Sequence, residues 1–231
     1  MTLTSIDSAP NGRRRRYLRE PVPLHFPVEE QVPESKLHRL LTNLLFELVE
    51  RELGDHALVA CDQFVYFDAS NPKQCLAPDV GIRLGATNRL LRTWKTWELG
   101  APHVGVEIVS DTDDLETTLE RYRRAGIAEL VRFDPEDLER PLRLWDLFDG
   151  DLVERDLADP EALHCDALGL WWCVRSDQTL GPTLRLARDR EGADLLPTAA
   201  EAEKAEKAEK AEKSAALARV AALEAELERK R

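Results

Sequence analysis

The chain has 231 residues, of which 43% are hydrophobic, and it carries a formal net charge of −12 at pH 7. This length accommodates one α/β domain of ordinary size with additional segments. The eight acids and eight bases after residue 198 cancel, so the whole acidic excess lies in residues 1–198. Such a balance argues against broad, non-specific binding of duplex nucleic acid, which depends on neutralising phosphates, but it leaves room for a local basic cleft.

The cysteines and the lack of long apolar runs indicate a reducing cytoplasm. Cys61, Cys75, Cys165 and Cys173 form no C-x-x-C pair, and no histidine accompanies them at zinc-finger spacing. No apolar run approaches the ~18 residues that a membrane span needs. We therefore predict a cytoplasmic protein with free thiols and no membrane partner.

The first part of the chain divides into an irregular arm and a helix. Residues 1–30 are rich in proline and contain the run Arg13–Arg16, which we interpret as a solvated leader, although it could also touch nucleic acid. From Leu37 to Val49, leucines recur at three- and four-residue spacing, which predicts an amphipathic helix that ends at Gly54. A folded domain is expected over residues 31–197.

Strands and one further helix are predicted in the middle of the chain. Three strands are expected, at Ala57–Phe67, Asp79–Leu84 and His103–Val109. A helix follows to about Arg124, with Asp113 or Asp114 as its N-terminal cap and Glu116 completing a capping box on Asp113.

A strand at Leu130–Phe133 and two hairpins should complete the domain. The first hairpin pairs Leu142–Leu147 with Leu152–Leu157 across an Asp-Gly turn. The second pairs Leu170–Arg175 with Thr183–Ala187. The predicted fold class is therefore α/β (α+β), with a mixed central sheet flanked by helices.

The composition changes completely at residues 198–231. An alanine-glutamate-lysine repeat leads into Ala216, Val220, Leu223 and Leu227, whose 4-3-4 spacing is that of a short heptad seam. We expect a long charged helix here. It is either a solvated single helix or a short coiled coil that makes the protein a homo-oligomer.

Two carboxylates stand out as candidates for chemistry. Asp79 follows a proline at the start of one predicted strand, and Glu107 lies inside the apolar strand V-G-V-E-I-V. Carboxylates that converge across a sheet form an oxygen site suited to Mg²⁺ or Mn²⁺. The alternative is structural: Asp79 could bond the local backbone, and Glu107 could pair with Arg83 or Arg121.

The sequence segments around these acids resemble the Uma-type family of restriction endonucleases, a branch of the PD-(D/E)xK superfamily. The resemblance covers about residues 31–205. The matching segments are P-E-S-K-L-H (33–38), A-P-D-V (77–80), K-T-W-E-L-G-A-P (95–102), V-E-I-V-S-D-T (106–112), E-R-Y-R-R-A-G-I-A-E-L (120–130), F-D-P (133–135), L-G-L-W (168–171) and L-L-P-T-A-A-E-A-E (195–203). It implies a restriction-endonuclease-like fold that acts on DNA.

The resemblance also implies roles for single residues. Asp79 and Glu107 match the metal-binding acids, and Glu34 and His38 match first-helix positions at which a glutamate often assists the metal or water. The alternative is that Glu34 only caps the helix and that His38 is a surface imidazole. In this family a catalytic lysine four residues before a tyrosine replaces the usual one. Tyr122 sets that register, and the lysine position holds Thr118.

Loss of the lysine leaves two functional hypotheses open. An ammonium orients the attacking water and offsets developing charge, and removing one such group costs on the order of 10²–10³ in rate. The chain is either a metal-dependent DNA endonuclease in which Lys95 or Arg121 substitutes, or an inactive nuclease-fold protein that binds nucleic acid or protein.

Overall fold

The computed structural model describes residues 35–110, 113–156 and 162–230. The predicted arm over residues 1–30 lies outside these residues, and so does Glu34. The helices are α1 (Lys36–Leu53), α2 (Thr96–Leu99), α3 (Leu115–Ala125) and α4 (Ala199–Arg229). The strands are β1 (Ala57–Ala60), β2 (Val65–Tyr66), β3 (Cys75–Leu76), β4 (Val80–Leu84), β5 (Trp94–Lys95), β6 (Val104–Ile108), β7 (Glu129–Phe133), β8 (Leu142–Phe148), β9 (Asp151–Glu154), β10 (Ala162–Cys165), β11 (Leu170–Asp177) and β12 (Gly181–Ala187).

A six-stranded mixed sheet forms the centre of the domain, in the order β1-β4-β6-β7-β8-β9. Strands β6 and β7 are parallel and are joined through α3, whereas the other neighbours in this sheet are antiparallel. Two small sheets, β10-β11-β12 and β3-β2-β5, accompany it. The predicted fold class, a mixed α/β fold with a central sheet and flanking helices, is confirmed.

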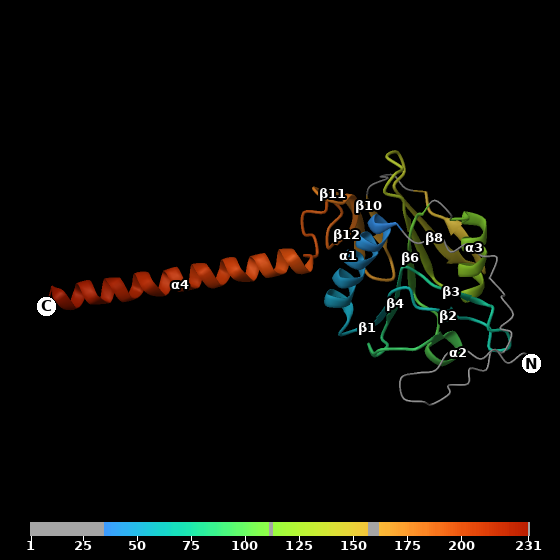
Figure 1. Ribbon diagram of the computed structural model, residues 1–231, viewed down its shortest axis with the longest axis horizontal. Helices are drawn as coiled ribbons and strands as arrows, with labels where there is room; N and C mark the ends of the chain where they lie inside the picture. The colour runs from blue at the N-terminus through green and yellow to red at the C-terminus, as the bar shows by residue number, and fades with distance from the viewer. Residues whose placement is uncertain (1–34, 111–112, 157–161, 231) are drawn as a thin grey trace, which may run out of the picture. The chain divides into compact units, whose positions relative to one another are not determined.

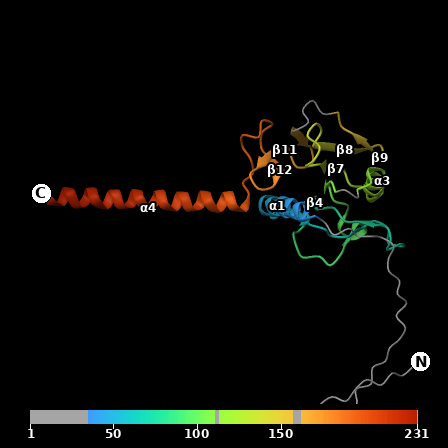
Figure 2. The ribbon, with the colours of Figure 1, turned by 45° about the horizontal axis from the view of Figure 1, so that its top comes forward.

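The two faces of the central sheet bury different clusters. In β6, alternation places Val104, Val106 and Ile108 in the cluster that also holds the buried leucines of α1. The opposite face packs against Tyr122 and Ala125 of α3. Figure 1 shows α1 and α3 on opposite sides of these strands, and Figures 1 and 2 place β11 and β12 beside α1.

Most predicted elements are confirmed. The strand predicted at Ala57–Phe67 is instead two strands of different sheets, β1 and β2, separated by a bend at which Asp62 has a positive φ. One predicted cap is also wrong. The N-cap of α3 is Asp114, which makes no side-chain capping bond. Asp113 instead accepts a hydrogen bond from the Ser110 backbone N–H at 2.8 Å, so the capping box predicted with Glu116 does not form. A capping box occurs at α4, between Thr198 and Glu201.

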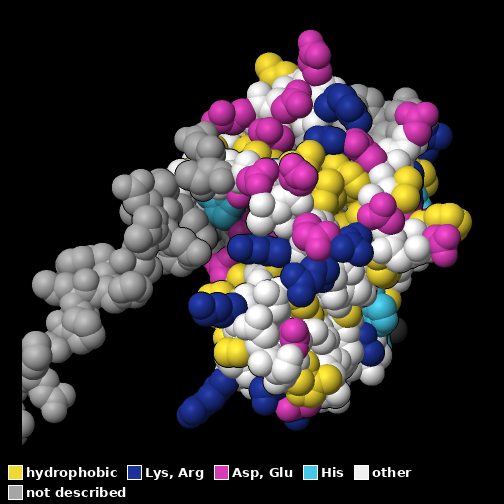
Figure 3. All heavy atoms as spheres, turned by 90° about the vertical axis from the view of Figure 1, so that its right-hand side faces the viewer, with side chains coloured by type: hydrophobic (Ala, Val, Ile, Leu, Met, Phe, Trp, Pro, Cys, Tyr) yellow, Lys and Arg dark blue, Asp and Glu magenta, His cyan; other side chains and the backbone are white. Residues whose placement is uncertain are grey.

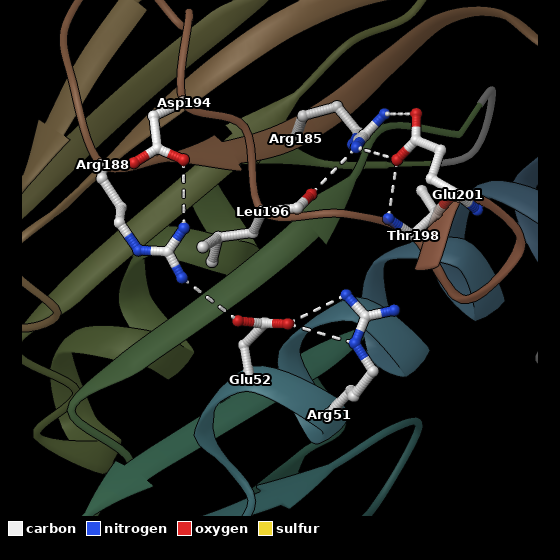
Figure 4. Close-up of polar contacts among 8 residues, drawn as sticks. All are labelled: Arg51, Glu52, Arg185, Arg188, Asp194, Leu196, Thr198 and Glu201. Atoms are coloured by element: carbon white, nitrogen blue, oxygen red, sulfur yellow. Dashed lines mark hydrogen bonds and ion pairs between the residues drawn. The ribbon is translucent and has the colours of Figure 1, made fainter. Parts of the chain in front are cut away.

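The C-terminal charged segment is helical, as expected. Its first turn is fastened to the domain by Arg185 of β12, which donates to both carboxylate oxygens of Glu201 and to the Leu196 carbonyl oxygen. Arg188 links the same region to Glu52 of α1 at 3.5 Å (Figure 4). No helix among the described residues is long and apolar enough to span a membrane.

Candidate active site

Asp79 lies directly before β4 and is held in place by backbone and side-chain donors. Its side chain is buried, with 5% of the residue exposed. Oδ2 accepts a hydrogen bond from the Ile108 N–H at 2.6 Å, across the β4–β6 boundary. Oδ1 accepts from the Thr42 hydroxyl of α1 at 3.4 Å. The carboxylate is therefore fixed at the point where β6 ends and α1 passes.

His38 of α1 completes this arrangement. Its Nε2 lies 2.9 Å from the Ile108 carbonyl oxygen and 3.3 Å from Asp79 Oδ2. A carbonyl oxygen can only accept, so we assign the proton to Nε2. The imidazole is buried, and it joins Asp79 to the backbone of β6.

Glu107 points to the opposite face of β6 from Val106 and Ile108, toward α3. Tyr122 of α3 donates its hydroxyl proton to Glu107 Oε1. Gly105 makes this contact feasible, because a Cβ there would lie 2.4 Å from the Tyr122 ring. Oε2 of Glu107 makes no hydrogen bond or ion pair with the described residues, so it remains available to a ligand.

The surroundings of Glu107 disfavour its ionised form. Burial, and then the negative charge of Asp79, raise the pKa of Glu107 well above its ordinary value, against the opposing effects of the Tyr122 hydrogen bond and the Arg132 charge. Burial, followed by the charge of Glu107, likewise raises the pKa of Tyr122 well above its ordinary value. Two carboxylates close enough to interact in this way are a site that a cation would stabilise.

Charged residues occupy neighbouring positions on β6, β7 and β8 beside Glu107. Glu107 of β6 is the register partner of Arg132 of β7, and Arg132 is in turn the partner of Arg143 of β8. Register partners point to the same face, so Arg132 lies on the α3 side with Glu107. The guanidinium of Arg132 is 3.7 Å from Asp113, in the loop before α3.

The residues considered as substitutes for the lysine lie elsewhere. Lys95 pairs with Glu98 at 3.0 Å, and both side chains are exposed. Arg121 is exposed and lines a surface pocket instead. Thr118 lies one helical turn before Tyr122 and is half-buried, so its hydroxyl is on the same side of α3 as Tyr122.

The ion pair predicted as the structural alternative for Glu107, with Arg83 or Arg121, does not form in the part of the chain that the structure describes. Among the described residues, neither Arg83 nor Arg121 pairs with Glu107, and Arg83 donates to the Ala101 carbonyl oxygen instead. The sequence patterns did not single out Arg132, and the alternative of a surface imidazole for His38 is wrong, because this residue is buried. The signal for Arg132 is an arginine inside the apolar run L-V-R-F, at a strand position that the crossover through α3 brings beside Glu107.

The oxygen donors fit a hard divalent cation, although the described residues hold no group of three or more His, Cys, Asp or Glu side chains able to bind a metal. Asp79, directly before β4, and Glu107 of the neighbouring strand β6 would provide carboxylate oxygen ligands. Mg²⁺ is commonly held by one or two carboxylates, with water and substrate phosphate completing its shell. The set is therefore compatible with Mg²⁺ or Mn²⁺.

Comparison with known proteins assigns the family. The model of the Uma2 family, described as "Putative restriction endonuclease", matches residues 27–175, which is well over half of the chain. The chain belongs to the Uma2 family. No curated protein matches it. A crystal structure of a putative nuclease belonging to DUF820, from Anabaena variabilis ATCC 29413, is similar at 12% identity with a TM-score of 0.44, over 58% of this chain and 74% of that chain.

A surface pocket of this Uma2-family chain lies apart from the carboxylates. It has a volume of about 710 Å³ and is lined by residues of α3, β9 and the segment at β3, and neither Asp79 nor Glu107 is among them. Four basic and four acidic side chains line it. Figure 3 shows Lys and Arg side chains gathered near the middle of this face, with Asp and Glu side chains around them. The pocket is therefore no uniformly basic groove for a nucleic-acid backbone.

Proposed function

We propose that this Uma2-family chain is a metal-dependent DNA endonuclease of the PD-(D/E)xK type, in which Asp79 and Glu107 hold Mg²⁺ or Mn²⁺. The observation that carries the proposal is the register of β4 and β6, which places the buried Asp79, directly before β4, opposite the half-buried Glu107, and the charge of Asp79 raises the pKa of Glu107. A divalent cation there would acidify a bound water and offset charge on a phosphoryl oxygen.

The chain's own residues hold the carboxylates for this task. The Ile108 N–H and the His38 imidazole fix the orientation of Asp79. Tyr122 fixes Glu107 from the side of α3 and leaves Oε2 available. Such preorganisation matters because misplacement by about 1 Å can cost on the order of 10² in rate.

Cleavage of a supercoiled plasmid tests the proposal. Wild-type protein should nick or linearise the plasmid in Mg²⁺ or Mn²⁺ and not in EDTA. Asp79→Asn should lose this activity, whereas Glu136→Gln, at an exposed loop position, should retain it. Equal cutting by wild type and Asp79→Asn would exclude Asp79 from the chemistry.

A second candidate is a nuclease-fold protein that binds nucleic acid or protein without cleaving. Thr118 favours it, because a hydroxyl supplies no charge where the family resemblance implies a lysine. In that case wild type should bind Mn²⁺ but leave plasmid intact, and Thr118→Lys should gain cleavage. Robust cutting by wild type would refute this candidate.

A further inference from the structure

We propose that Arg132 binds the scissile phosphate and supplies the positive charge that Thr118 cannot. The inference rests on the proposed function. It assigns a substrate-binding role to a β7 residue that lies outside both the acid pair and the helix position of the lysine.

The first argument is location. Arg132 is the direct register partner of Glu107 and lies on the same face of the sheet. In β4, Val80 pairs with Val106, so Asp79 precedes the strand at the level of Glu107. Asp79, Glu107 and Arg132 therefore lie next to one another across the neighbouring strands β4, β6 and β7. A phosphate that contacts a cation between the acids would lie within reach of the next strand.

The second argument is that the guanidinium is buried with its hydrogen-bonding capacity unused. Arg132 is 8% exposed, and its Nε is buried without a hydrogen-bond partner. Asp113 is its ion-pair partner, and at 3.7 Å the two groups are too far apart for a hydrogen bond. Buried guanidinium groups normally have their N–H donors satisfied, because desolvation is otherwise uncompensated. A phosphate oxygen would supply the missing acceptor, and arginine matches phosphate geometry well.

The third argument comes from the neighbouring arginine. Arg143 is the register partner of Arg132 on β8, but its Nε and Nη2 donate to the two oxygens of Glu154 at 2.8 and 2.7 Å. Arg143 is therefore a structural arginine with its donors engaged. Of these two arginines on the same face, Arg132 is the one equipped for an external anion.

The test uses the full chain with Arg132→Gln, Arg132→Lys and the matched control Arg143→Gln. Three quantities are measured: plasmid cleavage in Mn²⁺, the affinity for a labelled duplex from that plasmid in Ca²⁺ by fluorescence anisotropy, and Mn²⁺ affinity by calorimetry. Melting temperatures monitor folding.

In Arg132→Gln, we expect cleavage and DNA affinity to fall and Mn²⁺ affinity to rise. Cleavage should fall about 10²–10³-fold, and the affinity for DNA should fall about tenfold or more. Mn²⁺ should bind about threefold or more tightly, because a positive charge beside Glu107 is gone. Arg132→Lys should recover part of the cleavage, and Arg143→Gln should resemble wild type.

Two results would overturn the inference while leaving the proposed function intact. One is an Arg132→Gln protein that cleaves and binds DNA like wild type. The other is a joint fall of Mn²⁺ affinity, DNA affinity and melting temperature, which indicates a structural role. If wild type does not cleave, the proposed function fails, but the DNA affinities measured by anisotropy still test the inference. A lower DNA affinity of Arg132→Gln than of wild type supports phosphate binding by Arg132. Equal affinities of the two proteins, or no DNA binding by wild type, overturn the inference.

Discussion

The carboxyl group of Glu107 lies in a strand whose other side chains are apolar or absent. Its hydrogen bond to Tyr122 does not compensate fully for burial and for the charge of Asp79, so the pKa of Glu107 is raised. Ionised Glu107 therefore destabilises the metal-free fold, and a bound cation would relieve that cost. Residues that serve binding often reduce stability in this manner.

Glu107→Gln should accordingly stabilise the metal-free protein at pH 7. Above the ordinary glutamate pKa of 4.5, the folded state retains a proton that the unfolded state has lost, so wild-type stability falls as the pH rises through this window. The difference between variant and wild type should vanish below pH 4.5 and grow above it. Urea unfolding in EDTA at several pH values measures it, with Glu136→Gln as control. A less stable variant at pH 7 would contradict this account.

At the residue scale, the sequence predicted the acids better than their partners. Asp79 and Glu107 are recognisable because each is a carboxylate with distinctive neighbours, one directly before a strand and the other inside one. Arg132 and His38 reach the site through β-sheet register and through the packing of α1, which link residues far apart in the chain. Local spacing carries no information on such contacts.

At the scale of elements, the close approach of β6 and α3 depends on a residue without a Cβ. Gly105→Ala should destabilise the protein by about 1–3 kcal/mol and displace Tyr122, because the new Cβ would overlap the ring. Gly81→Ala is a matched control: Gly81 is the register partner of Gly105, and its nearest neighbours would be 3.8 Å away. Thermal unfolding of both variants measures the difference, and equal melting temperatures would show that β6 and α3 adapt.

The junction between β12 and α4 makes a second prediction at this scale. Glu201→Gln weakens the pairing of the buried Arg185 and should cost about 1–3 kcal/mol. Glu203→Gln removes only an exposed pair with Lys207 and should change stability by less than about 0.5 kcal/mol. Urea unfolding compares the two, and a larger effect of Glu203→Gln would refute the importance of the junction.

Elements with strong local signals were predictable, and the shortest ones were not. The β8–β9 hairpin follows from Asp149-Gly150, both of which adopt positive φ as a tight hairpin turn requires. Strands β2, β3 and β5 contain two residues each and exist only through their mutual pairing. No periodicity can reveal a two-residue strand.

At the scale of the whole molecule, the chain consists of the folded domain and the long helix α4, which has no buried residues. Val220, Leu223 and Leu227 of the predicted heptad seam are exposed, and so is the neighbouring Leu217. A seam of about two heptads supports only weak association. We expect the full chain to self-associate at high concentration through this seam.

Truncation after Lys204 tests this expectation, because it keeps Glu201 and the capping box. Sedimentation should show self-association of the full chain and a monomer for the truncated chain, with unchanged unfolding of the domain. Leu223→Lys in the full chain should act like the truncation. Equal masses for all three proteins would place any association outside α4.

The central claim, that Asp79 and Glu107 form one cation site, is tested most directly by calorimetric titration with Mn²⁺. Wild type should bind one ion, Asp79→Asn and Glu107→Gln should each bind it at least about tenfold more weakly, and Glu136→Gln should match wild type. Unaltered Mn²⁺ binding in both site variants, or no binding by the folded wild-type protein, would contradict the claim and leave the two carboxylates with a structural role.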